Sequence, residues 1–139
     1  MDLFTSLKIS GTALGAQRIR MNVVSANLAN AETTRTPEGG PYRKQDVVFR
    51  SASVGFAGDL EQALQGVAVA EIRTNPAPPR IIYDPAHPDA DPQGKVALPN
   101  VNLLEEMVDM MTATRSYEAN VTAVKSAKRM ALKALEIGR

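Results

Sequence analysis

Hydrophobic positions recur at alternating spacings of four and three residues over the last part of the chain, from Asn102 to Ile137. This spacing is the a/d repeat of a coiled coil, and it predicts one long α-helix because no Gly or Pro lies inside it. Pro99 and Asn100 precede the stretch as a start signal, and Gly138 follows it as a stop signal. The repeat positions are Leu103, Met107, Met110, Thr114, Tyr117, Val121, Val124, Lys128, Ala131 and Leu135.

The N-terminal stretch, residues 2–31, has the same spacing and predicts a second long helix. Asp2 or Thr5 can cap its start, and Asn27 and Asn30 favour its end because Asn tolerates left-handed backbone. A second apolar strip lies beside the first, so this helix needs cover on more than one side. The repeat positions are Leu3, Leu7, Ser10, Leu14, Gln17, Met21, Val24, Leu28 and Ala31, and the second strip is Ile9, Ala13, Ala16 and Val23.

The middle of the chain, residues 32–101, holds all 9 prolines and cannot continue either helix. Short runs of alternating or β-branched residues predict strands there, and Asp59–Gln65 is predicted to form a helical turn. We therefore expect a mainly α protein in which residues 1–31 and 102–139 pair as an antiparallel coiled-coil hairpin, with residues 32–101 as a small β-containing insert. The predicted strands are Asp46–Arg50, Gly66–Arg73, Arg80–Asp84 and Lys95–Leu98.

The best apolar members of the two repeats form the predicted helix-packing and polymer interface. Ordering an arm of about thirty residues costs more free energy than its few apolar contacts return, so we expect neighbouring chains to add burial. The predicted interface residues are Leu7, Leu14, Met21, Val24, Leu28, Leu103, Met107, Met110, Tyr117, Val121, Val124 and Leu135.

The totals disfavour several classes of function. A net charge of +1 gives no support for binding to nucleic acid or to an anionic membrane, and an aromatic content of 4% disfavours a large small-molecule pocket. The absence of Cys excludes disulfides, thiol catalysis and Cys-ligated zinc. No apolar run approaches the ~18 residues of a membrane-spanning helix. The N-terminus lacks the regions of a secretory signal, so we expect a cytosolic protein or one exported without a cleaved signal.

Basic residues are scattered through the first helix and the start of the insert. Such residues usually form a solvated face. An alternative is that they form salt bridges with the acidic first half of another chain's C-terminal helix, which carries Glu105, Glu106 and Asp109. The basic residues concerned are Arg18, Arg20, Arg35, Arg43 and Lys44.

Residues 84–92 form the richest polar cluster. The aspartates Asp84, Asp89 and Asp91, with the only His, His87, could ligate a metal. Their spacing matches neither a calcium-binding EF-hand loop nor a zinc motif, and a Pro-stiffened turn whose Asp side chains bond their own backbone explains the same residues. A metal-dependent enzyme is the alternative that a metal titration tests. No nucleophile elbow, P-loop or GxGxxG sequence is present, and we expect no catalytic site, metal or cofactor.

Several separated segments resemble bacterial flagellar rod and hook proteins. Residues 21–30 resemble the N-terminal signature of that family, and residues 33–43 resemble its continuation. Residues 83–90 and 99–108 are also similar, and residues 115–121 resemble the C-terminal motif of the axial proteins. The residues that carry the resemblance are Asn27, Leu28, Ala29, Asn30, Thr34, Pro37, Gly39, Gly40, Pro41, Tyr42, Asp84, Pro85, His87, Pro88, Glu106, Met107, Arg115, Tyr117 and Asn120.

The resemblance implies a structural subunit and no enzyme. Proteins of this family pair their terminal helices in the inner wall of the flagellar axis. They assemble with copies of themselves and other rod proteins, next to a membrane-ring adaptor, into a helical drive shaft that transmits torque and encloses the export channel. They reach the periplasmic rod of the basal body through the flagellar type III apparatus without signal cleavage. The repeats alone also fit a soluble coiled-coil adaptor or export chaperone, which a sizing column run with other rod proteins would distinguish.

Overall fold

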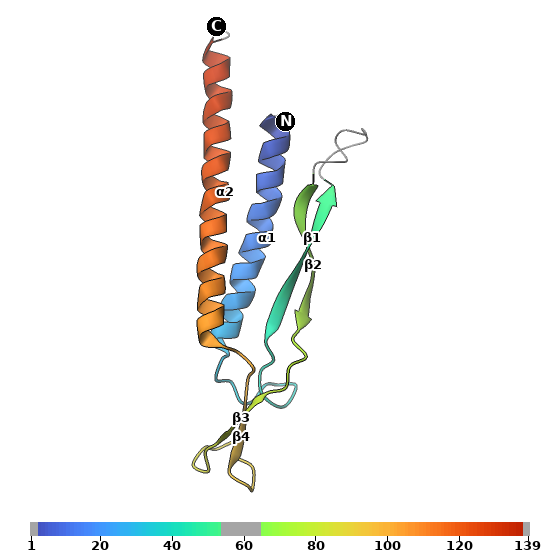
Figure 1. The fold of residues 1–139 in the computed structure, drawn as a ribbon, viewed down its shortest axis with the longest axis vertical. Coiled ribbons are helices and arrows are strands. Elements are labelled where there is room, and N and C mark those ends of the chain that lie inside the picture. The colour runs from blue at the N-terminus through green and yellow to red at the C-terminus, as the bar shows by residue number, and fades with distance from the viewer. Residues whose placement is uncertain (1–2, 54–64, 138–139) are drawn as a thin grey trace.

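A computed structural model describes residues 3–53 and 65–137 of the chain. Two long helices, α1 (Leu3–Ala29) and α2 (Leu103–Ile137), lie side by side and run in opposite directions (Figure 1). Both helices agree with the sequence prediction to within about two residues at each end that the structure describes. The predicted cap at Asp2 and stop at Gly138 lie outside the described residues. So does the predicted helical turn, except for Gln65, which begins a strand.

The start of α2 is set by local hydrogen bonds. The side-chain oxygen of Asn102 accepts the backbone N–H of Leu104 at 3.1 Å, which is the geometry of a helix N-cap. Glu105 and Glu106 occupy the first turn, where negative charge stabilises the positive end of the helix dipole. These signals explain why the sequence places the beginning of α2 correctly.

The end of α1 is closed by Asn30. Its backbone N–H and its side-chain amide both donate to the carbonyl of Ala26, at 3.1 and 2.9 Å, so Asn30 folds back onto the last helical turn. The hydroxyl of Thr33 then donates to the side-chain oxygen of Asn30 at 3.2 Å. The chain turns away from the helix axis at this point and enters the insert.

Four strands form two antiparallel hairpins in the insert. Strand β1 (Gln45–Ser53) pairs with β2 (Gln65–Thr74), with a register shift between Val48 and Phe49. Strand β3 (Arg80–Tyr83) pairs with β4 (Lys95–Leu98). Every predicted strand is present, and β1 extends beyond its predicted range at both ends.

Helix α1 lies between α2 and the β1–β2 hairpin, and it contacts both (Figure 1). The backbone N–H of Val67 in β2 donates to the hydroxyl of Thr12 in α1 at 3.2 Å. Ala16 and Val23, which belong to the second apolar strip of α1, are buried. The sequence predicts that the second apolar strip of α1 must be buried against something other than α2. The β1–β2 hairpin of the same chain buries much of it.

The face of α2 that meets α1 differs from the predicted repeat at every second position. Glu106, Ala113 and Ala127 are buried, although none of them is a predicted repeat position. Leu103 and Met107, the repeat positions on either side of Glu106, are 48% and 54% exposed. The contact stripe keeps the four–three spacing because it shares Met110, Tyr117, Val124 and Ala131 with the prediction. Small Ala side chains let the helices approach closely, so the stripe follows side-chain size as well as hydrophobicity.

The remaining exposed apolar residues of α2 lie at its two ends. Leu135, a predicted interface residue, is 71% exposed because α2 extends past the described start of α1 (Figure 1). Within the described residues, neither helix has a segment that is both long enough and apolar enough to cross a membrane.

Candidate functional site

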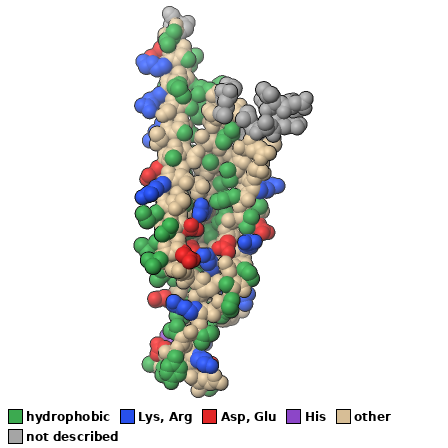
Figure 2. Space-filling model, in the orientation of Figure 1, with side chains coloured by type: hydrophobic (Ala, Val, Ile, Leu, Met, Phe, Trp, Pro, Cys, Tyr) green, Lys and Arg blue, Asp and Glu red, His purple; other side chains and the backbone are tan. Residues whose placement is uncertain are grey.

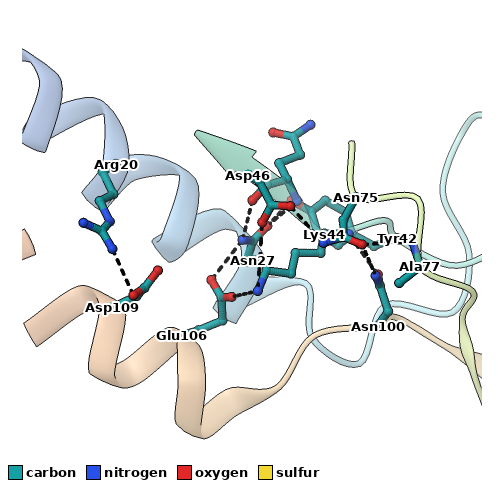
Figure 3. Close-up of polar contacts among 11 residues, drawn as sticks. Arg20, Asn27, Tyr42, Lys44, Asp46, Asn75, Ala77, Asn100, Glu106 and Asp109 are labelled. Atoms are coloured by element: carbon teal, nitrogen blue, oxygen red, sulfur yellow. Dashed lines mark hydrogen bonds and ion pairs between the residues drawn. The ribbon is translucent and has the colours of Figure 1, made fainter. Parts of the chain in front are cut away.

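A buried polar network lies where the two helices meet the insert (Figure 3). Asn27 of α1 and Glu106 of α2 are each 1% exposed. The side-chain amide of Asn27 donates to Glu106 Oε2 at 2.9 Å and to the carbonyl of Gln45 at 2.9 Å. The ammonium of Lys44 forms an ion pair with Glu106 Oε1 at 2.7 Å. We call Asn27, Tyr42, Lys44, Gln45 and Glu106 the polar junction.

Asn27 is fully hydrogen-bonded within the polar junction. Its side-chain oxygen accepts the hydroxyl of Tyr42 at 3.0 Å and the backbone N–H of Gln45 at 3.0 Å. With its two donated bonds, the side chain uses both of its donors and accepts two bonds. An Asp here would lack the donors that reach Glu106 and Gln45. The residue type is therefore dictated by the contacts.

A second set of hydrogen bonds attaches the polar junction to the β1–β2 hairpin and to the segment before α2. The side-chain oxygen of Asn100 accepts the backbone N–H of Lys44 at 3.3 Å, and the backbone N–H of Asn75 donates to the carbonyl of Lys44 at 2.8 Å. The amide of Asn75 donates to the carboxylate of Asp46 at 2.8 Å (Figure 3). The end of α1, the start of β1, the end of β2 and the approach to α2 are thus fixed together.

The electrostatics of the polar junction affect two titrating groups. Burial lowers the pKa of Lys44, but the hydrogen bond and charge of Glu106, helped by Asp46 and Glu105, outweigh it and hold that pKa above its ordinary value. Burial raises the pKa of Tyr42, and the negative charge of Glu106 raises it further. Both groups therefore keep their protons more tightly in the folded chain than in the unfolded one.

We expect the chain to lose stability at alkaline pH. Stability from a raised pKa is fully present below the unfolded values, 10.0 for Tyr42 and 10.5 for Lys44, and is lost as pH rises through the higher folded values. Thermal unfolding followed by circular dichroism between about pH 8 and about pH 11 measures this loss. The double variant Tyr42→Phe with Lys44→Gln should show a smaller drop, and an equal drop in both proteins would contradict the assignment.

A hollow of about 220 Å³ opens beside the polar junction, between α1, α2 and β1. Its charged groups pair with one another: Arg20 contacts Asp109 at 3.0 Å, and Lys44 contacts Glu106 at 2.7 Å. Both cations were predicted to lie on a solvated face or to meet another chain. The structure corrects this, because they meet the acidic first half of α2 within the same chain.

The loop between β3 and β4 uses two of its carboxylates to hold its own backbone. Asp84 accepts the backbone N–H of Ala86 at 3.1 Å. Asp91 accepts those of Gln93 and Lys95 at 2.8 and 2.9 Å. These bonds are the ones expected for a Pro-stiffened turn.

Asp89, the third carboxylate of this loop, is tied to the segment that follows α1, and His87 holds the backbone of Asp89. Asp89 accepts the hydroxyl of Thr34 at 2.7 Å and pairs with Arg35 at 3.2 Å. The backbone N–H of Asp89 donates to Nδ1 of His87 at 3.0 Å. In the described part of the chain, no three His, Asp or Glu side chains gather in a way that could hold a metal ion. The loop therefore acts as a brace between distant segments.

Residues 33–43, which follow α1, form a tight turn that positions Tyr42. Gly39 and Gly40 have φ values of 90° and 78°, which favour glycine. The backbone N–H of Thr36 donates to the carbonyl of Gly40 at 2.9 Å, and that of Tyr42 donates to the carbonyl of Thr33 at 3.0 Å. The turn thus directs the Tyr42 hydroxyl toward Asn27.

The predicted interface residues fall into three groups. Val24 is buried, and the exposed group is Leu103, Met107 and Leu135. The half-buried group is Leu7, Leu14, Met21, Leu28, Met110, Tyr117, Val121 and Val124.

The residues that carried the family resemblance also separate by position. Asn27, Tyr42 and Glu106 meet in the polar junction, and Thr34, Asp84 and His87 belong to the braced loops. Asn120 is half-buried and donates to the carbonyl of Ser116 at 2.8 Å, whereas Arg115 is exposed. Sequence reasoning assigned Lys44 to a solvated face or to another chain's C-terminal helix, and Asn100 to the start signal of the second helix, and it missed Gln45 and Asn75. The only signal for them was a set of polar residues at the predicted helix and strand ends.

Two family models match the chain on its terminal segments. The model described as flagella basal body rod protein matches residues 7–35, and the model described as flagellar basal body rod FlgEFG protein C-terminal matches residues 93–137. These segments contain most of α1, all of α2, and Asn27 and Glu106 of the polar junction. The fold and the matches define the class: a structural protein of the flagellar rod.

Individual relatives cover the whole chain. The chain is 48% identical to the flagellar basal-body rod protein FlgC of Borreliella burgdorferi, over 99% of this chain and 98% of that protein. It is 45% identical to FlgC of Bacillus subtilis and 43% identical to FlgC of Salmonella typhimurium, each over 100% of both chains. The chain belongs to the FlgC family of flagellar basal-body rod proteins. It is a structural rod protein and not an enzyme.

Proposed function

We propose that this chain assembles with copies of itself and with other rod proteins into the helical drive shaft that transmits torque and encloses the export channel. The observation that carries the proposal is the exposed apolar surface at both ends of α2. Contiguous exposed apolar surface on a soluble protein marks a surface that a partner covers. The residues concerned are Leu103, Leu104, Met107, Val108, Met111, Met130, Leu132, Leu135 and Ile137.

We further propose that the two helices act as an antiparallel coiled-coil hairpin, with residues 1–31 and 102–139 as the axial core and residues 32–101 as an outward-facing insert. The four–three spacing of the α2 contact stripe supports a coiled-coil arrangement. Packed helices deform little, so such a core is suited to transmitting torque. The polar junction fixes the insert to this core.

The family is a family of flagellar basal-body proteins. We propose the finer location, the periplasmic part of the rod next to the membrane-ring adaptor, and export through the flagellar type III apparatus without a cleaved signal. The predicted interface residues, from Leu7 to Leu135, become covered in the assembled rod under this proposal. The residues that are half-buried in the single chain keep part of their side-chain surface exposed, and that part is available for contact with another chain.

We expect the variants Met110→Asp and Val121→Asp to abolish swimming while the chain is still made. Met110→Asp places a carboxylate in the contact of α2 with α1, and Val121→Asp places one at a half-buried position that becomes covered in the rod. An unpaired buried charge is costly in either place. Swimming is measured in a strain whose own copy is deleted and replaced by the variant. Thr122 is exposed and adjacent to Val121, so a strain that carries Thr122→Asp should swim normally. Normal swimming of the first two variants, or absence of the wild-type chain from purified basal bodies, would contradict the proposal.

A further inference from the structure

Methionine is the only sulfur-containing residue of this chain. The sequence has 6 Met, no Cys and no Trp, so the Met thioethers are its most easily oxidised side chains. The structure describes five of them, and they fall into two groups. Met107, Met111 and Met130 are 54%, 55% and 60% exposed. Met21 and Met110 are half-buried.

Two of the exposed methionines belong to one apolar patch at the start of α2. Leu104, Met107, Val108 and Met111 are separated by three or four residues, so they lie on one face of the helix. Each of the four side chains is more than half exposed. Figure 2 shows hydrophobic side chains along the outer edge of the molecule, at the height where α2 begins in Figure 1. We call these four residues the methionine patch.

The half-buried methionines are shielded by the contact between the two helices. Met110 precedes Met111 by one residue but belongs to the α2 contact stripe that meets α1. The sulfur of Met21 lies 3.7 Å from the hydroxyl of Thr114 across the same contact. Folding therefore shields these two sulfur atoms, and it leaves those of the methionine patch open to oxidants in solution.

We propose that the methionine patch is an oxidation site, and that sulfoxides at Met107 and Met111 keep the chain out of the rod. This inference concerns the regulation of the proposed function and rests on it. Hydrogen peroxide transfers one oxygen atom to the thioether sulfur: its O–O bond breaks, an S–O bond forms, the sulfur loses two electrons and water leaves. Methionine sulfoxide reductases remove the oxygen as water while two of their thiols become a disulfide, so the modification is reversible.

The modification acts on assembly and leaves the fold intact. A sulfoxide is polar, and in the free chain water supplies hydrogen-bond donors to its oxygen because Met107 and Met111 are exposed. When the methionine patch is covered in the rod, that oxygen loses its water, and burial of an acceptor without a donor is costly. The other side chains of the patch, Leu104 and Val108, have no donor to replace the water. Oxidation therefore disfavours the covered state alone.

The purified chain tests the site itself. After limited treatment with hydrogen peroxide, mass spectrometry should find Met107 and Met111 oxidised at least about fivefold faster than Met110, because oxidation follows exposure. Circular dichroism should show an unchanged unfolding midpoint at the stage where only exposed methionines carry oxygen. Equal oxidation rates at Met110 and Met111, or unfolding caused by oxidation of the exposed methionines, would overturn the assignment of the site.

A pulse experiment in cells tests the effect on assembly. The strain lacks methionine sulfoxide reductases and withholds one other rod protein, so isotope-labelled chains accumulate unassembled. A pulse of hydrogen peroxide is quenched before the missing rod protein is induced. Labelled chains in purified basal bodies should carry sulfoxide at Met107 or Met111 at least about tenfold less often than labelled chains left unassembled. Equal sulfoxide fractions in the two pools would overturn the inference.

The variant Met107→Leu with Met111→Leu is the matched control, since Leu keeps the apolar volume and has no sulfur. It retains Met130, so oxidation there affects both proteins alike. Its labelled chains should enter basal bodies equally well with and without the pulse, whereas those of wild type should enter less well after it. A pulse that impaired both proteins equally would also overturn the inference. Absence of untreated wild-type chain from basal bodies would instead overturn the proposed function.

Discussion

Replacing Glu106 with Ala should lower the free energy of unfolding by about 3–5 kcal/mol, because removing one partner of a buried ion pair leaves the other uncompensated. The ammonium of Lys44, 2.7 Å from Glu106, would keep only Asp46, at 4.0 Å, as an ion-pair partner, and Asn27 would lose the acceptor of one amide hydrogen bond. A domain of ordinary stability has only about 5–15 kcal/mol in total. Chemical denaturation followed by circular dichroism measures the change.

The neighbouring residue supplies a matched control. Glu105 lies in the same helical turn but is exposed, so Glu105→Ala should change stability by less than about 0.5 kcal/mol. Replacing both Glu106 and Lys44 with Met should recover part of the loss, since a buried ion pair is often replaced by apolar residues at little cost. Equal losses in Glu106→Ala and Glu105→Ala would contradict the buried position of Glu106.

Ala113→Leu should separate the two helices. Ala113 is 0% exposed where α2 faces α1, and additional carbon atoms in a closely packed contact cost about 1–3 kcal/mol. The separation would also strain the ion pair between Arg20 and Asp109, one turn away on α2. We expect both a lower unfolding midpoint and a loss of swimming.

Ala123→Leu on the exposed side of α2 makes the same chemical change outside the contact. This variant should keep stability within about 0.5 kcal/mol of wild type. If Ala113→Leu were as stable as Ala123→Leu, the close approach of α1 and α2 at this position would be wrong.

The helices and strands could be predicted because local signals agree with the final fold. Long stretches with a four–three apolar spacing, no internal Pro, and Asn at their boundaries leave little choice except helix. The strands follow from alternating or β-branched runs such as Gly66–Arg73. Strand β1 was predicted too short because Ser51, Ala52 and Ser53 have low strand preference on their own. They become extended because β2 pairs with them through its first residues.

The polar junction could not be predicted, because its members are polar residues made buried by partners far away in the sequence. From the sequence alone, Lys44 is expected to be solvated. In the fold, its ammonium forms an ion pair with Glu106 in the first turn of α2. The phase of the α2 contact stripe was missed for the same reason. A hydrophobic repeat passes over Glu106 and gives little weight to Ala113, although both are buried.

A repeat of apolar residues also arises in two ways, from contacts inside one chain and from contacts between chains. Met110 and Tyr117 meet α1 within the chain, whereas Met107 keeps the same repeat and remains exposed. A single sequence gives no means of separating contacts inside a chain from contacts between chains, since both remove apolar surface from water. The structure separates them by showing what the chain covers by itself.

The polar junction has a consequence for the order of events during synthesis. Asn27 and Glu106 are 79 residues apart, so a nascent chain must wait for α2 before the network can close. Until then α1 has only the β1–β2 hairpin beside it, which the ribosome makes soon after α1. A chain that stops before Glu106 keeps Lys44 in water and leaves the α2-facing side of α1 bare. Completion of the polar junction thus separates finished chains from truncated ones, which chaperones and proteases can recognise by that uncovered helix.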